Sequence, residues 1–352
     1  MKNNVDYIIV GQGLAGSALA WELMQRGKSL MVFDTPFANQ SSTIAAGIYN
    51  PITGRVLTQT WKASTLFPFL DNFYTNAEKE THEKFLHKLP VYRPFLSDEE
   101  RKTWQPRAES QDFEKIRLNI LPPNSFSIPN PYGGIEIIDS GYLNVAGWLT
   151  AVQQKLLDRG SYVSEVFDEA ALIAGEKIEY RDIVAKKIIF CNGIEILKSK
   201  YFSWLPVRPL KGETLTVELP FVPERIFNRG VYVVPTETKD IYRVGATYEH
   251  QPFSTSPTEN GKKYLAEGLT ELIGKPFRII HQEWGIRPTS PDRRPMLGAH
   301  PGNKNIIAFN GLGTKGVSLS PYFAHHLALW LEETGDLSTE VNIYRFKALY
   351  SS

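Results

Sequence analysis

Residues 7–16 of the chain read YIIVGQGLAG, a run of four apolar residues followed by a glycine cluster at Gly11, Gly13 and Gly16. A short apolar run is typical of a buried strand, and a glycine cluster is typical of a tight turn. Helical spacing then recurs in four apolar residues: Ala15, Ala18, Leu19 and Leu23. The stretch therefore predicts a strand, a turn and a helix.

A second buried strand is predicted at residues 29–33, which read SLMVF and lead to Asp34. In a strand–turn–helix–strand unit, such glycines permit the turn, let a pyrophosphate approach the helix N-terminus, and allow close packing of helix on strand. The alternative is a glycine-rich turn that binds nothing. The candidate nucleotide-binding residues of this unit are Gly11, Gly13, Leu14, Ala15 and Gly16.

Asp34 follows Gly16 by 18 residues. At that distance a carboxylate would accept hydrogen bonds from ribose hydroxyls and repel a ribose phosphate, which argues against NADP. Close behind it, residues 41–51 read SSTIAAGIYNP, and the hydroxyls of Ser42 and Thr43 favour a second phosphate contact at a helix start. A simple helix cap is the alternative interpretation.

A second glycine pattern, GLGTKG at 311–316, also follows a predicted strand and precedes a predicted helix. Too little chain follows it for another crossover unit with its own ribose-binding acid. Its backbone N–H groups could instead meet negative charge developing on a reduced flavin ring, assisted by Thr314 or Lys315. The alternative is an ordinary glycine turn. The cofactor candidates here are Gly313, Thr314, Lys315 and Gly316.

Composition excludes several classes of protein. The chain has 352 residues, which at roughly 100–200 residues per domain suggests two domains. The chain has 39 Lys+Arg and 38 Asp+Glu, so its net charge of +1 gives no overall attraction for nucleic acid or membranes. A local patch of charged residues is still compatible with this balance. The single cysteine, Cys191, permits no internal disulfide.

No apolar run approaches the ~20 residues that span a bilayer. The first residues lack the basic segment and long apolar core of a secretory signal, so we expect a cytoplasmic protein. The histidine pairs, His82 with His87 and His325 with His326, show no metal-ligand spacing, and we predict no metal site.

The organisation of the chain predicts an α/β (α+β) fold. Residues 64–131 read as an insert of charged helical pieces broken by prolines, without alternation of strand and helix. Between residues 206 and 287 the residues alternate with period two, which predicts a mostly antiparallel sheet. Because no linker is visible, we expect two interleaved domains.

Eight motifs, in this order and spacing, make the chain resemble the D-amino-acid-oxidase-like family of FAD-dependent oxidoreductases, which includes glycine and sarcosine oxidases. They are GQGLAG with Asp34, AAGIYNP at 45–51, IIFCNG at 188–193, LPVRPLKGE at 205–213, YVVP at 232–235, VGAT at 244–247, GIRPTSPDRRPMLG at 285–298 and NGLGTKGVSLSP at 310–321.

The resemblance implies a Rossmann-like FAD-binding domain interleaved with an antiparallel-sheet substrate domain. We expect the FAD-binding domain at 1–75, 136–204 and 286–352, and the substrate domain at 76–135 and 205–285. Covalent flavin in this family uses a cysteine or histidine near the ring, whereas Cys191 belongs to a nucleotide-domain strand. We therefore expect non-covalent FAD.

Within the family, VGATYE and GLGTKG resemble the oxidase half of the enzyme that matures carboxymethylaminomethyl-uridine in tRNA, and other details resemble glycine oxidases. The sequence departs from the family where Asp34 replaces the usual Glu, and where Thr314 and Lys315 replace an arginine of glycine oxidases. The resemblance therefore leaves one contact to a substrate carboxylate open.

Three residues are candidates for substrate chemistry. Arg287 matches the family's carboxylate-binding arginine, and a planar guanidinium suits that role. A structural ion pair with Asp292 is its alternative. Tyr232 could place its hydroxyl against the same carboxylate, or be an ordinary strand tyrosine. Arg243 lies about where sarcosine oxidases carry a lysine that helps oxygen react, although an exposed strand arginine is the commoner explanation.

The resemblance also implies flavin contacts at Ala46, Gly47, Ile48 and Gly193. At Gly47 and Ile48 a small residue would let the ring approach the backbone, and a buried helix turn is the alternative.

Three functions remain open. The first is an FAD-dependent amine or amino acid oxidase or dehydrogenase, which takes a hydride from the carbon next to the nitrogen of a small amino acid or N-substituted glycine and gives an imine that hydrolyses. The second is a tRNA-modifying oxidase acting on a carboxymethylaminomethyl nucleoside, which the net charge of +1 does not favour. The third is a non-catalytic flavin-binding protein.

Overall fold

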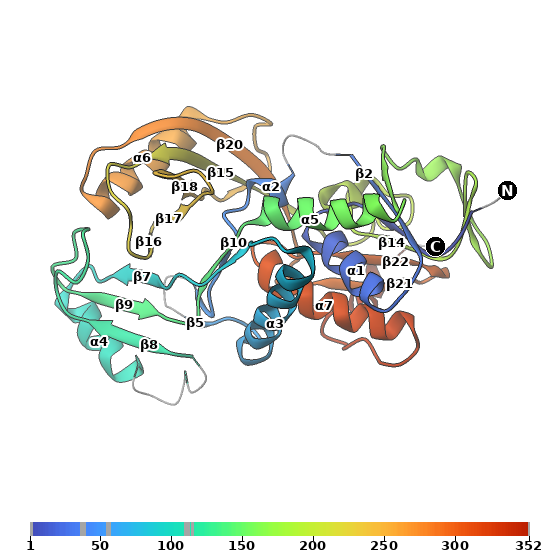
Figure 1. Ribbon diagram of the computed structural model, residues 1–352, viewed down its shortest axis with the longest axis horizontal. Coiled ribbons are helices and arrows are strands. Elements are labelled where there is room, and N and C mark those ends of the chain that lie inside the picture. The colour runs from blue at the N-terminus through green and yellow to red at the C-terminus, as the bar shows by residue number, and fades with distance from the viewer. Residues whose placement is uncertain (1–2, 36–39, 54–57, 109–112, 114–115, 351–352) are drawn as a thin grey trace. The chain divides into compact units, whose positions relative to one another are not determined.

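The computed structural model describes residues 3–35, 40–53, 58–108, 113 and 116–350 of the chain (Figure 1). It divides into two compact units, each assembled from separate stretches of sequence. Unit 1 contains Met1–Thr43, Ala146–Leu210 and Ile286–Ser352. Unit 2 contains Ile44–Val145 and Lys211–Gly285.

Unit 1 is built on an eight-stranded sheet. Its parallel part runs in the order β11–β2–β1–β14–β22, and Ile8 lies opposite both Met31 and Ile188. Parallel strands covered on both faces are apolar along their whole length, which explains the runs YIIV and LMVF. The strands are β1 (Asn3–Val10), β2 (Leu30–Asp34), β11 (Tyr162–Ser164), β12 (Leu172–Ala174), β13 (Ile178–Tyr180), β14 (Ile183–Phe190), β21 (Met296–His300) and β22 (Asn303–Asn310).

Three long helices pack in unit 1: α1 (Leu14–Gln25), α5 (Val145–Asp158) and α7 (Gly316–Leu331). Helices α1 and α7 lie side by side (Figure 1), and Arg26 Nη1 contacts Glu332 Oε2 at 2.7 Å just beyond their ends. The rings of Trp21 and Trp148 meet edge to face at 5.6 Å between α1 and α5. This packing fixes the N-terminus of α1 beside the ends of β1 and β2.

Unit 2 is built on a nine-stranded sheet. Its path is β19–β15–β18–β17–β16–β7–β9–β8, and β20 also pairs with β15. Helix α6 (Glu259–Ile273) packs on this sheet, and its Leu265 and Leu269 belong to one apolar cluster with Leu215 and Val244. The strands are β7 (Val91–Pro94), β8 (Leu118–Leu121), β9 (Gly134–Ile137), β15 (Arg208–Glu218), β16 (Ile226–Arg229), β17 (Val231–Pro235), β18 (Ile241–Gly245), β19 (Glu249–His250) and β20 (Arg278–Thr289).

The remaining elements of unit 2 are short, apart from two helices. They are β3 (Ile48–Tyr49), β4 (Ile52–Thr53), β5 (Thr58–Gln59), α3 (Ala63–Thr81), β6 (Leu86–His87), α4 (Asp98–Ala108) and β10 (Gly141–Leu143). Strands β3, β10 and β6 form a small sheet. A four-residue helix, α2 (Ser41–Ile44), leads from unit 1 into this region.

The mixed α/β fold class predicted from sequence is confirmed. The insert at 64–131 differs from its prediction, because β6, β7 and β8 lie within it and β7 and β8 join the large sheet. These strands have at most four residues and pair with distant partners, so they leave little periodic signal. Residues 44–75 and 136–145 also belong to unit 2, whereas the prediction grouped them with residues 1–43.

None of the helices in the described ranges combines the length and the apolar character that crossing a membrane requires.

Candidate functional site

The glycine loop after β1 forms an open helix N-terminus. Gly11 has a φ of +97°, and a Cβ there would lie 2.7 Å from the carbonyl oxygen of Cys191. Gly13 is the N-cap of α1, and the first turn holds no acidic side chain. Because backbone N–H groups at such an end lack helical acceptors, the loop can bind a phosphate.

Ser42 reaches this loop from α2. Its Oγ accepts a hydrogen bond from Leu14 N at 3.2 Å, so it lies at the start of α1. The hydroxyl of Thr43 is turned elsewhere and donates to Gln40 O at 2.9 Å. Of the two predicted hydroxyls, the structure therefore brings Ser42 to the first glycine loop.

Asp34 ends β2 next to the same loop. Backbone N–H groups of Gln12 and Thr35 and the side chain of Gln40 donate to its carboxylate. Burial raises the pKa of Asp34, and these hydrogen bonds offset only part of that rise. A partly buried acceptor at the end of β2 is suited to the hydroxyls of a ribose.

Two buried oxygens near this loop point to a missing polar partner. Thr35 Oγ1 and Asn192 Oδ1 find no hydrogen-bond partner among the described residues. Thr35 follows Asp34, and the backbone of Asn192 lies against Gly11. Since a buried polar atom without a partner costs about 1–3 kcal/mol, a polar ligand here would relieve that cost. The site therefore fits the adenosine and phosphate part of FAD.

The second glycine loop, at 311–316, is tied to its neighbours by hydrogen bonds. Asn310 donates to Gly193 O at 2.8 Å and accepts from Gly311 N at 2.8 Å. Gly313 N donates to Pro288 O at 3.0 Å. The loop thus connects the end of β14 with the end of β20.

Lys315 and Thr314 differ in their surroundings within this loop. Lys315 is the N-cap of α7 and half-buried, while Thr314 is exposed. Burial, together with the nearby charge of Arg293, lowers the pKa of Lys315. Of these two predicted cofactor residues, Lys315 is therefore the more buried.

Arg287 lies on β20 directly before Pro288, so the bond between Pro288 and Gly313 holds it beside the second glycine loop. Its side chain is half-buried. Asp292, its alternative ion-pair partner, accepts two hydrogen bonds from Arg345, from Nε to Oδ2 at 2.8 Å and from Nη2 to Oδ1 at 3.3 Å. Both oxygens of the Asp292 carboxylate therefore contact Arg345.

In unit 2, Tyr232 lies on β17 opposite Gly245 of β18. Its hydroxyl occupies the space that a side chain at Gly245 would need. Gly245 in turn lies opposite Thr214 of β15. The absence of a side chain at Gly245 therefore determines where the Tyr232 hydroxyl can lie.

Gly47 is required by its backbone and by its neighbour. Its φ is +72°, and a Cβ would collide with the carbonyl oxygen of Leu143. Leu143 N donates to Gly47 O at 3.0 Å. Because Gly47 lies between α2 and β3, the alternative of a buried helix turn does not describe it. Ala46 and Ile48, on either side, are half-buried.

Arg243 projects from β18 and is bonded on two sides. Nη1 donates to Ile44 O at 2.7 Å, and Nη2 donates to Glu283 Oε2 at 3.1 Å. Its side chain is 20% exposed. The predicted alternative of an exposed strand arginine therefore does not describe it.

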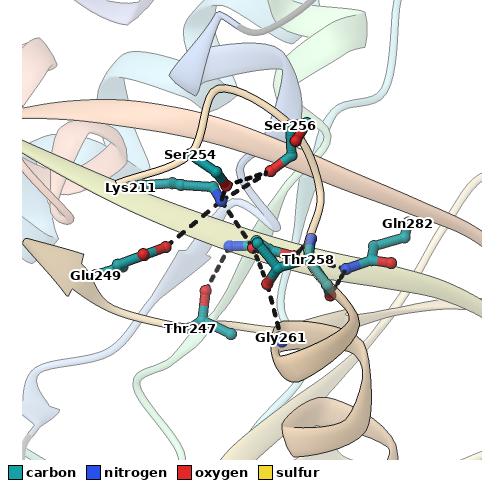
Figure 2. Close-up of polar contacts among 9 residues, drawn as sticks. Lys211, Thr247, Glu249, Ser254, Ser256, Thr258, Gly261 and Gln282 are labelled. Atoms are coloured by element: carbon teal, nitrogen blue, oxygen red, sulfur yellow. Dashed lines mark hydrogen bonds and ion pairs between the residues drawn. The ribbon is translucent and has the colours of Figure 1, made fainter. Parts of the chain in front are cut away.

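A buried polar cluster in unit 2 was not anticipated from the sequence (Figure 2). Lys211 and Glu213, with side chains 0% and 1% exposed, form an ion pair at 2.9 Å. Lys211 Nζ also donates to Ser254 Oγ and Ser256 O, both at 2.8 Å. The Glu213 carboxylate accepts hydrogen bonds from Thr258 N at 3.0 Å, from the Thr258 hydroxyl at 2.8 Å and from the Gln282 side-chain amide.

The cluster fixes the connection between β18 and α6. Thr247 Oγ1 accepts from Glu213 N at 2.8 Å, and Thr258 caps α6 by accepting from Gly261 N at 3.0 Å. The sequence signal was two opposite charges, Lys211 and Glu213, two residues apart and so on the same face of one strand. Charges of this kind are rarely buried unless paired, and their spacing does not reveal the partner loop.

Unit 1 thus brings together the first glycine loop, Asp34, Ser42, Gly193, the second glycine loop and Arg287. Unit 2 brings together Gly47, Tyr232 and Arg243. Among the residues that the structure describes, no group of three or more His, Cys, Asp or Glu side chains could hold a metal ion.

Comparison with known proteins identifies the family and the fold of the chain. The sequence pattern of a family described as FAD dependent oxidoreductase matches residues 6–330. A glycine oxidase of Pseudomonas aeruginosa is 29% identical and covers 91% of this chain and 93% of its own length. The crystal structure of a glycine oxidase from Geobacillus kaustophilus superposes with a TM-score of 0.79 at 18% identity, covering 97% of this chain and 98% of that one.

Other relatives are longer. The bifunctional protein ThiO/ThiG of Trichormus variabilis is 26% identical over 93% of this chain and 53% of its own length. The tRNA 5-methylaminomethyl-2-thiouridine biosynthesis bifunctional protein MnmC of Idiomarina loihiensis is 24% identical over 97% of this chain and 59% of its own length. The chain therefore spans little more than half the length of these curated relatives.

The family pattern covers most of the chain and includes both glycine loops, Asp34 and Arg287. The chain belongs to the FAD dependent oxidoreductase family, and it is an enzyme with FAD as its cofactor.

Proposed function

We propose that this protein oxidises the C–N bond of a small amino acid or an N-substituted glycine. The observation that carries the proposal is Arg287, a half-buried guanidinium next to the second glycine loop. A planar guanidinium binds a carboxylate through two parallel hydrogen bonds, which orients a short substrate. Relatives and structural neighbours named as glycine oxidases support this substrate class.

FAD, when bound, would supply the acceptor for the hydride from the carbon next to the nitrogen, and the imine product would then hydrolyse. In the proposed arrangement, the Arg287 guanidinium holds the substrate carboxylate. In the same proposal, backbone N–H groups at the start of α7, with Lys315, would stabilise negative charge on the reduced cofactor. Gly47 and Ile48 leave room for the ring to approach the backbone.

We propose that FAD is held without a covalent bond and that the protein works in the cytoplasm. Cys191 is buried at the end of β14, and burial raises the pKa of its thiol. A buried thiol with a raised pKa is a weak nucleophile, so it is poorly suited to attach a flavin.

A second candidate function is oxidation of a carboxymethylaminomethyl nucleoside in tRNA. It is favoured by the relative named as a tRNA 5-methylaminomethyl-2-thiouridine biosynthesis protein. Such a nucleoside also presents a secondary amine beside a carboxylate, so Arg287 would suit either substrate. The balanced charge of the chain gives no global attraction for RNA.

The two substrates can be separated by following flavin absorbance without oxygen. The protein is mixed with glycine, sarcosine, other N-substituted glycines or carboxymethylaminomethyl-uridine. Bleaching by a free amino acid supports the first function, and bleaching by the nucleoside alone supports the second. If none of these compounds reduces the flavin, the proposed substrate class is wrong.

The role of Arg287 is tested by Arg287→Ala. A charge-assisted hydrogen bond contributes about 1.5–3 kcal/mol, so losing two should weaken substrate binding by about 100-fold or more. Arg278→Ala is the matched control, because Arg278 lies on the same strand with a side chain 70% exposed. Unchanged affinity for a carboxylate substrate in Arg287→Ala would refute the role.

A further inference from the structure

The guanidinium of Arg243 joins two groups that come from distant parts of the sequence. One is the carbonyl oxygen of Ile44, at 2.7 Å from Nη1, and the other is the carboxylate of Glu283, at 3.1 Å from Nη2. All three residues belong to unit 2. Arg243 of β18 lies opposite Val234 of β17, and Val234 is two residues after Tyr232. Because side chains alternate along a strand, the side chains of Arg243 and Tyr232 project from the same face of the sheet.

Ile44 is the last residue of the four-residue helix α2. The last carbonyl groups of a helix accept no hydrogen bond from an N–H group of the same helix, so their donors come from elsewhere. Arg243 supplies that donor for Ile44. Three residues further along, Gly47 O accepts from Leu143 N at 3.0 Å. The segment from Ile44 to Gly47 is therefore held by a carbonyl at each end, with only Ala45 and Ala46 between them.

We propose that Arg243 is a positioning residue: with Glu283 it holds the Ile44 carbonyl and so fixes the Ala45–Ile48 backbone, which carries the expected cofactor contacts Gly47 and Ile48. The inference depends on the proposed function only through the expected place of the ring at Gly47 and Ile48. It differs from the sequence-based expectation that Arg243 is a cation that helps oxygen react. The carboxylate of Glu283 lies within ion-pair distance and offsets the positive charge that such a role would need.

The two roles predict opposite effects for Glu283→Gln. This change keeps the cation of Arg243 and removes the opposing charge, so an oxygen-activating cation would be left intact or strengthened. A positioning residue would instead lose its ion-pair partner Glu283. Arg243→Lys separates the roles again, because an ammonium keeps the charge but cannot reproduce the two-pronged geometry of a guanidinium.

The experiment uses Arg243→Met, Arg243→Lys and Glu283→Gln, with Arg278→Met as the control on an exposed strand position. Apoprotein is titrated with FAD to obtain the dissociation constant. The FAD-bound protein is then reduced with dithionite, and its reoxidation by oxygen is timed. Neither measurement needs an amine substrate, so a failure of the proposed function does not affect them.

We expect the FAD dissociation constant to rise about tenfold or more in Arg243→Met, less in Arg243→Lys, and about two- to fivefold in Glu283→Gln. Reoxidation of the bound flavin should stay within about twofold in Glu283→Gln. The inference is overturned if all three variants bind FAD as the wild type does. It is equally overturned if Arg243→Met slows reoxidation about tenfold and Arg243→Lys restores it. If Arg243→Met does not fold, the other two variants still decide.

Discussion

The ion pairs Lys211–Glu213 and Arg243–Glu283 lie in the same unit but have different surroundings. The first is fully enclosed, with exposures of 0% and 1%, and its further partners come from the connection between β18 and α6 and from Gln282 of β20 (Figure 2). The second is 20% and 25% exposed, and its arginine donates to the backbone carbonyl of Ile44. Removing one member of an enclosed pair leaves a buried charge, whereas water can replace a lost partner at the half-exposed pair.

The largest difference between the two pairs should appear with Lys211→Met. The change leaves the carboxylate of Glu213 buried in unit 2 without its ion-pair partner. Breaking a buried pair in this way lowers the free energy of unfolding by about 3–5 kcal/mol. Urea unfolding at pH 7 measures it. Lys263→Met is the control, because Lys263 is 74% exposed and its change should cost less than about 0.5 kcal/mol. Equal losses in both variants would remove the contrast between the pairs.

Glu213→Gln should have the next largest effect, about 1.5–3 kcal/mol at pH 7, through weaker hydrogen bonds to Lys211 and Thr258. Burial acts to raise the pKa of Glu213, but hydrogen bonds from Thr258, Lys211 and Gln282 lower it overall. A lowered pKa in the folded state stabilises the protein above the unfolded value near 4.5, and this contribution is lost as pH falls through the folded value.

The stability gap between wild type and Glu213→Gln should therefore narrow as the pH falls below about 4.5. Urea unfolding from pH 7 to pH 3 measures the gap at each pH. A gap that stays constant over this range would show that the charge of Glu213 does not stabilise the cluster.

Thr258→Ala sharpens the comparison by removing the residue that joins the enclosed pair to α6. Losing an N-cap costs about 0.5–2 kcal/mol, and Glu213 would lose a donor as well. Thermal unfolding of Thr258→Ala is compared with that of Thr270→Ala, an exposed position on the same helix. If both changes lower the midpoint equally, the cap does not depend on the enclosed pair.

The smallest effect on stability is expected for Glu283→Gln. Glu283→Gln removes one charge but keeps a hydrogen-bonding side chain beside Arg243, and this partly exposed pair is in reach of water, so the loss should be about 1 kcal/mol and the urea midpoint should move little. This is useful because the same variant is expected to weaken FAD binding. A loss of more than about 2 kcal/mol would place Arg243–Glu283 in the same class as the enclosed pair.

Several features of this protein could be read from its sequence because they depend on neighbouring residues. The strand, turn and helix at 7–25 follow from an apolar run, the glycine loop and helical spacing, and Asp34 ends the next strand as predicted. These features are local, so a short stretch specifies them. The same holds for the strands around Tyr232 and Arg243, whose alternating residues mark β17 and β18.

Other features were decided only by the tertiary structure. Ser42 reaches the start of α1, Arg243 reaches the Ile44 carbonyl, and Lys211 and Glu213 enclose each other against the connection before α6. Each contact except the Lys211–Glu213 pair itself joins residues far apart in sequence, and none repeats with a helical or strand period. The sequence by itself therefore determined the nucleotide-binding unit and the cofactor family, because glycines, apolar runs and a spaced acid act locally. The partners of each buried charge depended on packing between distant segments, where burial and pairing are settled together.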